Sequence, residues 1–246
     1  MQRAEMIGFG ILGAAAALAG AAALTRAGNG TRQPRDAPRL RSPRNAAVPA
    51  HLLAARKLNH SSALLALSVL ADSGMEHYRG SFENRAMFAP LIVSLLSLAA
   101  GVHGGQDNKP SAHRGRDAIY LMAAATGITG SGFHLYNVMK RPGGFGWQNL
   151  FYAAPLGAPI AMLLSGALGA AAERLRDEPA REPRLWGMPA GRALALLASV
   201  GLVGTIGEVA LLHVRGAFHN PAMYAPVTIP PVAAAPAATV PRAIAP

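Results

Sequence analysis

The chain has 246 residues, of which 51% are apolar and 14% are charged, and it contains no cysteine. Soluble domains usually carry about 25% charged residues, so this composition favours a membrane protein. The absence of cysteine excludes disulfides, iron–sulfur clusters held by the chain and covalent c-type haem. The net charge of +11 lies mainly in segments between apolar runs, which argues against nucleic-acid binding and for topology-setting loops.

The first apolar run extends from Met6 to Leu24 and is rich in alanine and glycine. A cleaved signal peptide is one interpretation, but the run is longer than the usual apolar region of about 7–15 residues. We therefore interpret residues 1–25 as an uncleaved first transmembrane span, or signal anchor. Residues 26–57 form a linker with eight basic residues and one acid, Asp36, and such a segment is expected on the cytoplasmic side.

Five further runs are long and apolar enough to cross a bilayer as helices, which needs about 20 residues. Their approximate bounds are His60–Glu76, Ala86–Val102, Ala118–Val138, Asn149–Ala172 and Ala190–Leu212. The abundant small residues suit close packing of helices in lipid. The predicted fold class is all-α: a polytopic membrane bundle of about six transmembrane helices, with residues 58–226 as the bundle.

Basic residues predict the orientation of this bundle. Sixteen of the 23 Lys and Arg fall in or beside residues 26–57, 103–117 and 173–189, which alternation of the spans places on one side. The positive-inside rule assigns that side to the cytoplasm. We expect a multi-pass protein of the cell membrane, of the bacterial inner-membrane type, whose partners are the lipid bilayer and other membrane subunits but no nucleic acid.

Two segments 136 residues apart are near copies of each other. The segment from His77 to Pro90 aligns without a gap with the segment from His213 to Pro226, and nine of the fourteen positions are identical. The same offset pairs Asp72 with Glu208. Repetition of this kind predicts a structural unit that is used more than once, here a helix hairpin with its turn at the outer surface.

A third outer loop resembles both copies, because Asn149 again precedes an Ala-Pro pair. Asn84, Asn149 and Asn220 each open an apolar run, and asparagine is a strong helix N-cap, so all three are predicted structural caps. Residues 227–246 are rich in proline and alanine. A straight seventh helix is not expected after Pro226, and the end of the chain is predicted to be extended.

Two carboxylates fall inside predicted spans. Asp72 and Glu208 each precede a histidine by five residues, about 7.5 Å along a helix. Ionisable groups at this depth are costly and mark functional sites. The alternative is a structural ion pair with Arg79 or Arg215.

Histidines end three predicted spans at the same outer depth: His77, His134 and His213. Together with Asp72 and Glu208 they make a candidate metal site, since imidazole and carboxylate ligands suit iron, manganese, zinc or copper. Paired imidazoles also suit haem b, so the candidate cofactor is haem b or a non-haem transition metal. Arg79 and Arg215 follow the histidines and are candidates for contact with an anion or a haem propionate, or for interfacial positions.

No nucleotide-binding loop, serine nucleophile elbow or His-Glu-x-x-His motif is present, and no catalytic residue is assigned. Three functions remain open from the residues. The leading one is a metal- or haem-binding redox protein, such as the membrane anchor of an electron-transfer complex. The alternatives are a transporter of a metal ion or small solute, and a membrane assembly scaffold without a ligand.

Overall fold

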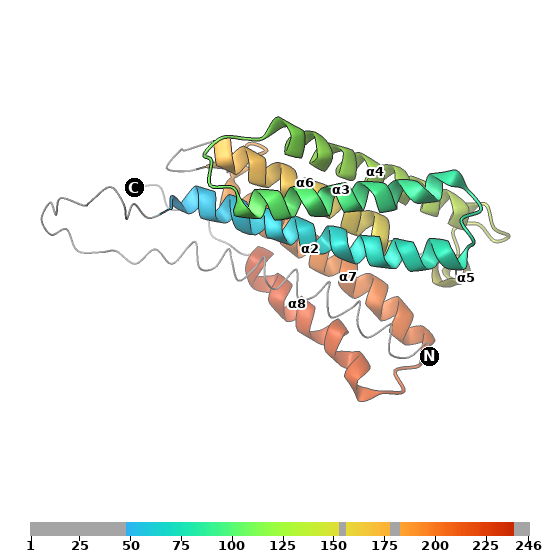
Figure 1. The fold of residues 1–246 in the computed structure, drawn as a ribbon. Coiled ribbons are helices and arrows are strands. Elements are labelled where there is room, and N and C mark those ends of the chain that lie inside the picture. The colour runs from blue at the N-terminus through green and yellow to red at the C-terminus, as the bar shows by residue number, and fades with distance from the viewer. Residues whose placement is uncertain (1–47, 153–155, 178–182, 239–246) are drawn as a thin grey trace, which may run out of the picture.

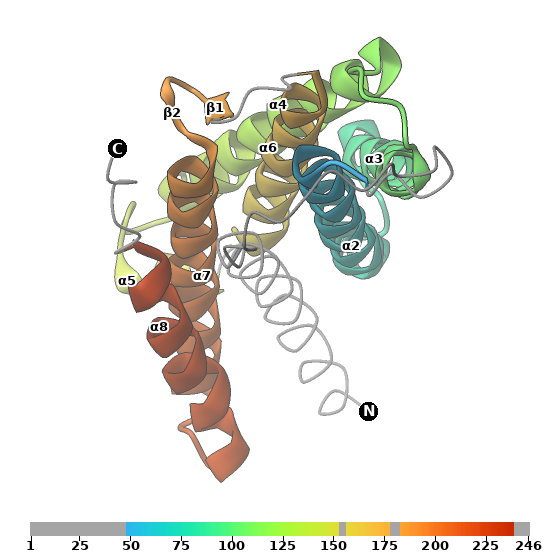
Figure 2. The same ribbon diagram turned by 90° about the vertical axis from the view of Figure 1, so that its left-hand side faces the viewer.

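The computed structural model describes residues 48–152, 156–177 and 183–238, and these ranges are mostly α-helical. This confirms the all-α class. Four long helices form a bundle and two more form a hairpin that splays away from it (Figures 1 and 2). The bundle consists of α2 (Ala50–Arg79), α3 (Phe88–Gln106), α4 (Arg114–Met139) and α6 (Gly157–Asp177), and the hairpin of α7 (Ala190–Arg215) and α8 (Ala225–Ala238).

Short elements connect these helices. They are the 3-10 helices η2 (Arg85–Met87) and η3 (Pro221–Tyr224), the short helix α5 (Trp147–Tyr152), and the antiparallel strands β1 (Arg184–Leu185) and β2 (Met188–Pro189). Within the bundle, α2 packs on α3 and α6, and α4 packs on α6 and α3. Outside it, α7 packs mainly on α8 and has a smaller contact with α6.

The five predicted spans within the described residues are helical, but only two helical segments there are both long and apolar enough to cross a membrane. These are Arg85–Gln106 and Ala190–Ala210. Polar residues such as Asn59, Ser62 and Asp72 lower the mean hydropathy of α2. That helix is long enough to cross a membrane but is not apolar enough. The run from Met6 to Leu24 lies outside the described residues.

Three predicted boundaries differ from the structure. Helix α2 begins at Ala50 rather than near His60, because the carbonyl of Pro49 accepts the first N–H bonds and starts the helix there. The run predicted from Asn149 to Ala172 contains two separate helices, α5 and α6. The prediction of no straight helix after Pro226 is also wrong, since α8 extends from Ala225 to Ala238 and packs on α7. Pro226 lies in the first turn of α8, where a missing N–H costs no helical bond.

Small and polar side chains fill the centre of the bundle. The hydroxyl of Ser62 donates to the carbonyl of Ser165 at 2.8 Å, and Ser97 lies 3.1 Å from the Ser165 hydroxyl. Glycines allow the helices to approach closely. A Cβ on Gly127 would lie 2.4 Å from the backbone N of Leu163, and one on Gly166 would lie 2.4 Å from the carbonyl of Tyr120. Helices α4 and α6 are therefore in backbone contact.

Large apolar side chains lie on the outside of the same helices. They include Ile92, Leu95, Ile128, Phe133, Val200 and Val203, each between 56% and 70% exposed. A soluble bundle usually buries residues of this kind and exposes charge. Here large apolar side chains are exposed, while the interior combines apolar clusters with buried polar and charged groups.

The two turns of the sequence repeat have the same structure. In the first, Nδ1 of His77 lies 2.7 Å from the carbonyl of Met87; in the second, Nδ1 of His213 lies 2.7 Å from the carbonyl of Met223. Phe82 stacks on Phe88, and Phe218 stacks on Tyr224 at the equivalent place. The repeat is thus a unit of structure as well as of sequence.

This turn explains most of the identical residues in the repeat. Asn84 and Asn220 cap η2 and η3, each accepting a 2.9 Å bond from the backbone N–H two residues later. A Cβ on Gly216 would lie 2.9 Å from the Met223 methyl group, so the methionine packs against the glycine. Two residues before each cap have positive φ. In the first turn they are Ser81 and Phe82. The stacked phenylalanine and the backbone bonds from the N–H groups of Ser81 and Phe82 both lie in this strained segment.

Candidate functional site

The repeat-related carboxylates are Asp72, on α2, and Glu208, on α7. Both side chains are half-buried, and the charge of Asp72 has a small electrostatic effect on Glu208. Glu76 and His77 also lie within electrostatic range of Asp72. The two carboxylates thus occupy equivalent, half-buried positions on two different helices.

Glu208 also has a structural contact. Its Oε1 accepts a 3.0 Å hydrogen bond from the backbone N–H of Gly157, the first residue of α6. A carboxylate stabilises a helix N-terminus because the first N–H groups have no partner in the helix. A Cβ on Gly157 would overlap this carboxylate, so the Glu208 side chain would have to move to accommodate one. Glu208 thus ties α7 to the start of α6.

His77 and His213 are held in one tautomer by their turns. A carbonyl oxygen can only accept, so the Nδ1 atom facing it carries the hydrogen in both histidines. In the neutral ring, Nε2 then keeps its lone pair. Metal-binding histidines are commonly oriented by a bond of this kind from the second ring nitrogen. This geometry leaves Nε2 of each ring able to bind a metal. The Nδ1 bond by itself also has a structural role, because it closes the turn.

The remaining predicted site residues are dispersed. Arg79 forms an exposed ion pair with Glu76 at 2.9 Å rather than with Asp72. His134 is half-buried on α4. The Arg215 side chain lies outside the described residues. Asn149 differs from its predicted role as a cap: it lies inside α5, and its amide donates to the carbonyls of Pro142 and Gly144.

The two repeated turns lie at the ends of diverging hairpins. The turn between α2 and α3 and the turn between α7 and α8 are well separated in both views (Figures 1 and 2). Among the residues that the structure describes, no three His, Asp or Glu side chains are grouped so that they could hold a metal ion.

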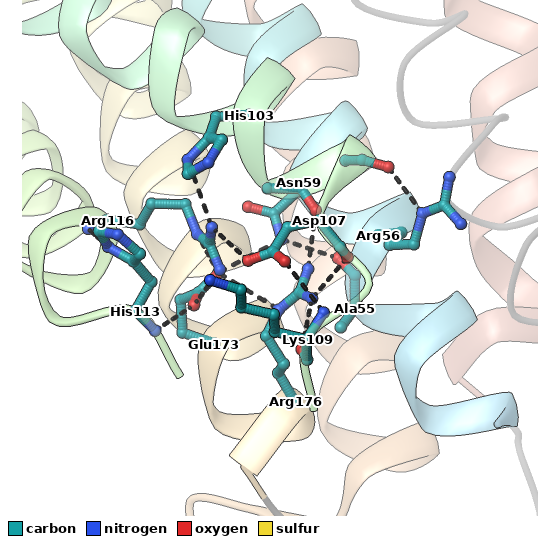
Figure 3. A network of polar contacts seen from close by, with 12 residues as sticks. Ala55, Arg56, Asn59, His103, Asp107, Lys109, His113, Arg116, Glu173 and Arg176 are labelled. Atoms are coloured by element: carbon teal, nitrogen blue, oxygen red, sulfur yellow. Dashed lines mark hydrogen bonds and ion pairs between the residues drawn. The ribbon is translucent and has the colours of Figure 1, made fainter. Parts of the chain in front are cut away.

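A second polar cluster occupies the other end of the bundle, where the predicted cytoplasmic loops lie (Figure 3). Its centre is a buried ion pair between Arg116 on α4 and Glu173 on α6. Nε and Nη2 of Arg116 each lie 2.9 Å from a different carboxylate oxygen of Glu173, which is a bidentate contact. Nη1 of Arg116 donates to Asp107 at 2.9 Å. We call Asp107, Arg116, Glu173 and Arg176 the ion network.

Arg176 connects the ion network to the end of α3. The side chain is fully buried, and its guanidinium donates to the carbonyls of Gly104, Asp107 and Lys109. These carbonyls belong to the last turn of α3 and the loop that follows it, where helical carbonyls have no N–H partner. Arg176, on α6, therefore provides hydrogen-bond donors for the free carbonyls at the C-terminus of α3.

Polar neighbours complete the ion network. The amide of Asn59 donates to Ala55 and to Glu173, and the Tyr120 hydroxyl donates to Asn59. The backbone N–H of His113 donates to the second Glu173 oxygen at 2.8 Å. Burial alone would raise the pKa of Asp107, but the Lys109 N–H and the Arg116 guanidinium hold this pKa below its usual value. Asp107 is thus held in its charged form by opposite charge and hydrogen bonds.

We compared the chain with known protein families, characterised proteins and solved structures. No protein-family model, characterised protein or solved structure matches the chain.

The ion network was missed because its charges were interpreted only as markers of topology. One local signal was available: Glu173 and Arg176 are three residues apart, so they share a helix face. The pairing of Arg116 with Glu173 depends on how α4 packs on α6, over 57 residues of sequence. No periodicity within either helix indicates that contact.

Proposed function

We propose that this chain is an integral membrane protein that binds a cation between Asp72 and Glu208 and moves it through the outer half of the bundle. Embedding in lipid is supported by the distribution of side chains, with large apolar residues outside and serine, asparagine and an ion network inside. Packing of this type relies on small residues at helix contacts, as at Gly127 and Gly166. The two sufficiently apolar helical segments agree with this assignment.

The cation-binding proposal is carried by the half-burial of two carboxylates at repeat-equivalent positions of α2 and α7, Asp72 and Glu208. Two negative charges in low dielectric repel each other, and a bound cation or proton removes that cost. Carboxylate oxygens favour hard cations such as Mg²⁺, Ca²⁺ and Mn²⁺. Glu208 also joins the splayed hairpin to the bundle through the Gly157 N–H, so binding at Glu208 can be coupled to the position of the hairpin.

Titration of the purified protein in detergent with Mn²⁺, followed by the electron paramagnetic resonance signal of free Mn²⁺, tests this site. We expect Asp72→Asn and Glu208→Gln each to weaken Mn²⁺ affinity at least about tenfold, equal to about 1.4 kcal/mol. Glu83→Gln is the matched control, because Glu83 is exposed in the outer turn. Equal binding by all variants, or no binding by the unmodified protein, would exclude a cation site at this pair.

The second candidate is a redox protein with a haem or transition metal held through His77 or His213. It is favoured by the shared tautomer, which leaves Nε2 of both rings facing away from the turn carbonyls. On this hypothesis the purified protein shows a Soret band or bound iron, and His77→Ala and His213→Ala each reduce it by more than half. His51→Ala, on the first turn of α2, should leave it unchanged. An absorption spectrum without a Soret band and a chain free of transition metal would remove this candidate.

A further inference from the structure

A short β-hairpin before α7 carries an exposed tryptophan at its tip. Strands β1 and β2 pair Leu185 with Met188, so Trp186 and Gly187 form a two-residue turn. Both turn residues have positive φ, 52° for Trp186 and 78° for Gly187. Turns of this kind favour Asn-Gly or Gly-Gly, because a bulky side chain is strained at positive φ. Tryptophan is therefore an unfavourable residue for the turn itself.

Packing within the described chain does not account for this tryptophan. The indole is 46% exposed. Phe82 and Phe218 also have positive φ and stack on a neighbouring ring, whereas Trp186 has no stacking partner among the described residues. The adjacent Leu185 is 1% exposed and belongs to an apolar cluster with residues of α2, α6 and α7. Leu185 thus fixes the hairpin to the bundle, and the hairpin presents Trp186 outwards.

The hairpin lies at the depth where the apolar segments end. It directly precedes Ala190–Ala210, one of the two segments that are apolar enough to cross a membrane (Figure 2). The other, Arg85–Gln106, ends on the same side, where a carbonyl of its last turn accepts a 2.7 Å bond from Arg56 of α2. Ala55, next to Arg56, belongs to the same apolar cluster as Leu185. A bilayer that covers both segments therefore has its interface at the hairpin.

We propose that the β1–β2 hairpin is an interfacial anchor that places Trp186 in the phospholipid headgroup region at the start of α7. Tryptophan is enriched at this depth because its ring is apolar and its indole N–H needs a polar partner. This use explains why a strained position carries tryptophan. The anchor rests on the membrane embedding proposed above and does not depend on cation binding.

Two arginines beside the tip match the charge of lipid phosphates. Arg184 and Arg192 are both exposed and flank the turn in the sequence. The Arg184 guanidinium donates to the Gly187 carbonyl at 2.6 Å, which holds it beside the turn. A guanidinium has five N–H donors, so others are left for a phosphate oxygen. The charges at the hairpin therefore fit the negative phosphates of the headgroup region.

Fluorescence of Trp186 in phospholipid vesicles tests the anchor. The chain has two tryptophans, so Trp147→Phe leaves Trp186 as the single indole. The variant is reconstituted with lipids that carry bromine either near the carbonyl end or near the methyl end of their acyl chains. We expect the shallow bromines to quench the emission at least about twice as strongly as the deep ones. Any other order, or no quenching by either lipid, would overturn the proposal.

A second measurement uses Trp186→Cys with a spin label, because the chain has no cysteine of its own. Relaxation of the label by oxygen and by a water-soluble nickel complex, present on both sides of the vesicles, reports its depth. Val200→Cys, in the apolar segment, is the control for hydrocarbon, and Lys109→Cys, in the exposed loop after α3, is the control for water. The label at residue 186 should lie between the two controls.

A label at residue 186 that is as accessible to nickel as the Lys109 control, or as inaccessible as the Val200 control, would overturn the anchor. Failure of the unmodified protein to enter vesicles would overturn it together with the embedding. Loss of the cation site alone, by Mn²⁺ titration, leaves the expected depth of Trp186 unchanged, so the two proposals fail separately.

Discussion

Replacing Glu173 with glutamine is expected to lower the free energy of unfolding by about 3–5 kcal/mol. Glu173 accepts both bonds of the Arg116 guanidinium and lies 3.8 Å from Nε of Arg176, which has no hydrogen-bond partner of its own. Both arginines are almost completely buried. A neutral amide would leave two neighbouring positive charges with Asp107 as the remaining carboxylate of the ion network, and in a low-dielectric interior water does not replace the missing opposite charge.

The measurement is thermal unfolding in detergent, with Asp177→Asn as the control on the same helix. Asp177 is exposed at the end of α6, so its variant should unfold at the unmodified temperature. Adding Arg116→Met to Glu173→Gln should restore part of the lost stability, because it removes one of the unpaired charges. If Glu173→Gln and Asp177→Asn behaved alike, the ion network would not contribute to stability.

Adding a methyl group at Gly127 or Gly166 is expected to destabilise the bundle by about 1–3 kcal/mol for each substitution. A Cβ on Gly127 would lie 2.4 Å from the Leu163 backbone N and 2.7 Å from the Pro159 carbonyl. Backbone atoms cannot move aside as a flexible side chain does, so α4 and α6 must separate. The core serine contacts at Ser165 depend on the same helix and should be weakened with them.

Gly132→Ala is the matched control for Gly127→Ala, since both glycines lie on α4 and nothing is within 4 Å of a Cβ at Gly132. Alanine is a better helix former than glycine, so the control should be unchanged or slightly stabilised. The measurement is the thermal unfolding of the unmodified protein and of the Gly127→Ala, Gly166→Ala and Gly132→Ala variants. A Gly127→Ala protein as stable as the control would show that α4 and α6 are not in backbone contact.

The sequence predicted the helices well because apolar runs of this length form helices whichever way they pack. It also predicted the repeated turn, since identical residues at identical spacing require the same local bonds, as His77 and His213 show. The position of the two turns relative to each other could not be predicted from the repeat. The divergence of α7 and α8 from the bundle depends on packing against α6, which no repeat records.

Proline content led to the wrong expectation for α8. Prolines weaken a helix in isolation, but the N-terminal position of Pro226 and the packing of α8 on α7 outweigh that penalty. For the ion network, the sequence shows the charged residues but not their partners. Its residues were visible as loop charges, yet Asp107 and Arg176 acquire their partners only when α3, α4 and α6 are brought together.

The contact between Glu208 and the start of α6 has a mechanical consequence. At its beginning α7 is anchored by a buried apolar cluster that joins Ala193 and Leu194 to α2 and α6. Towards its other end it is linked to α6 by the bond from Gly157 to Glu208. Among the described residues, α7 is thus held to α6 by apolar packing near its start and by a hydrogen bond to a carboxylate further along the helix. Neutralising Glu208 is expected to weaken the second contact and to leave the first intact.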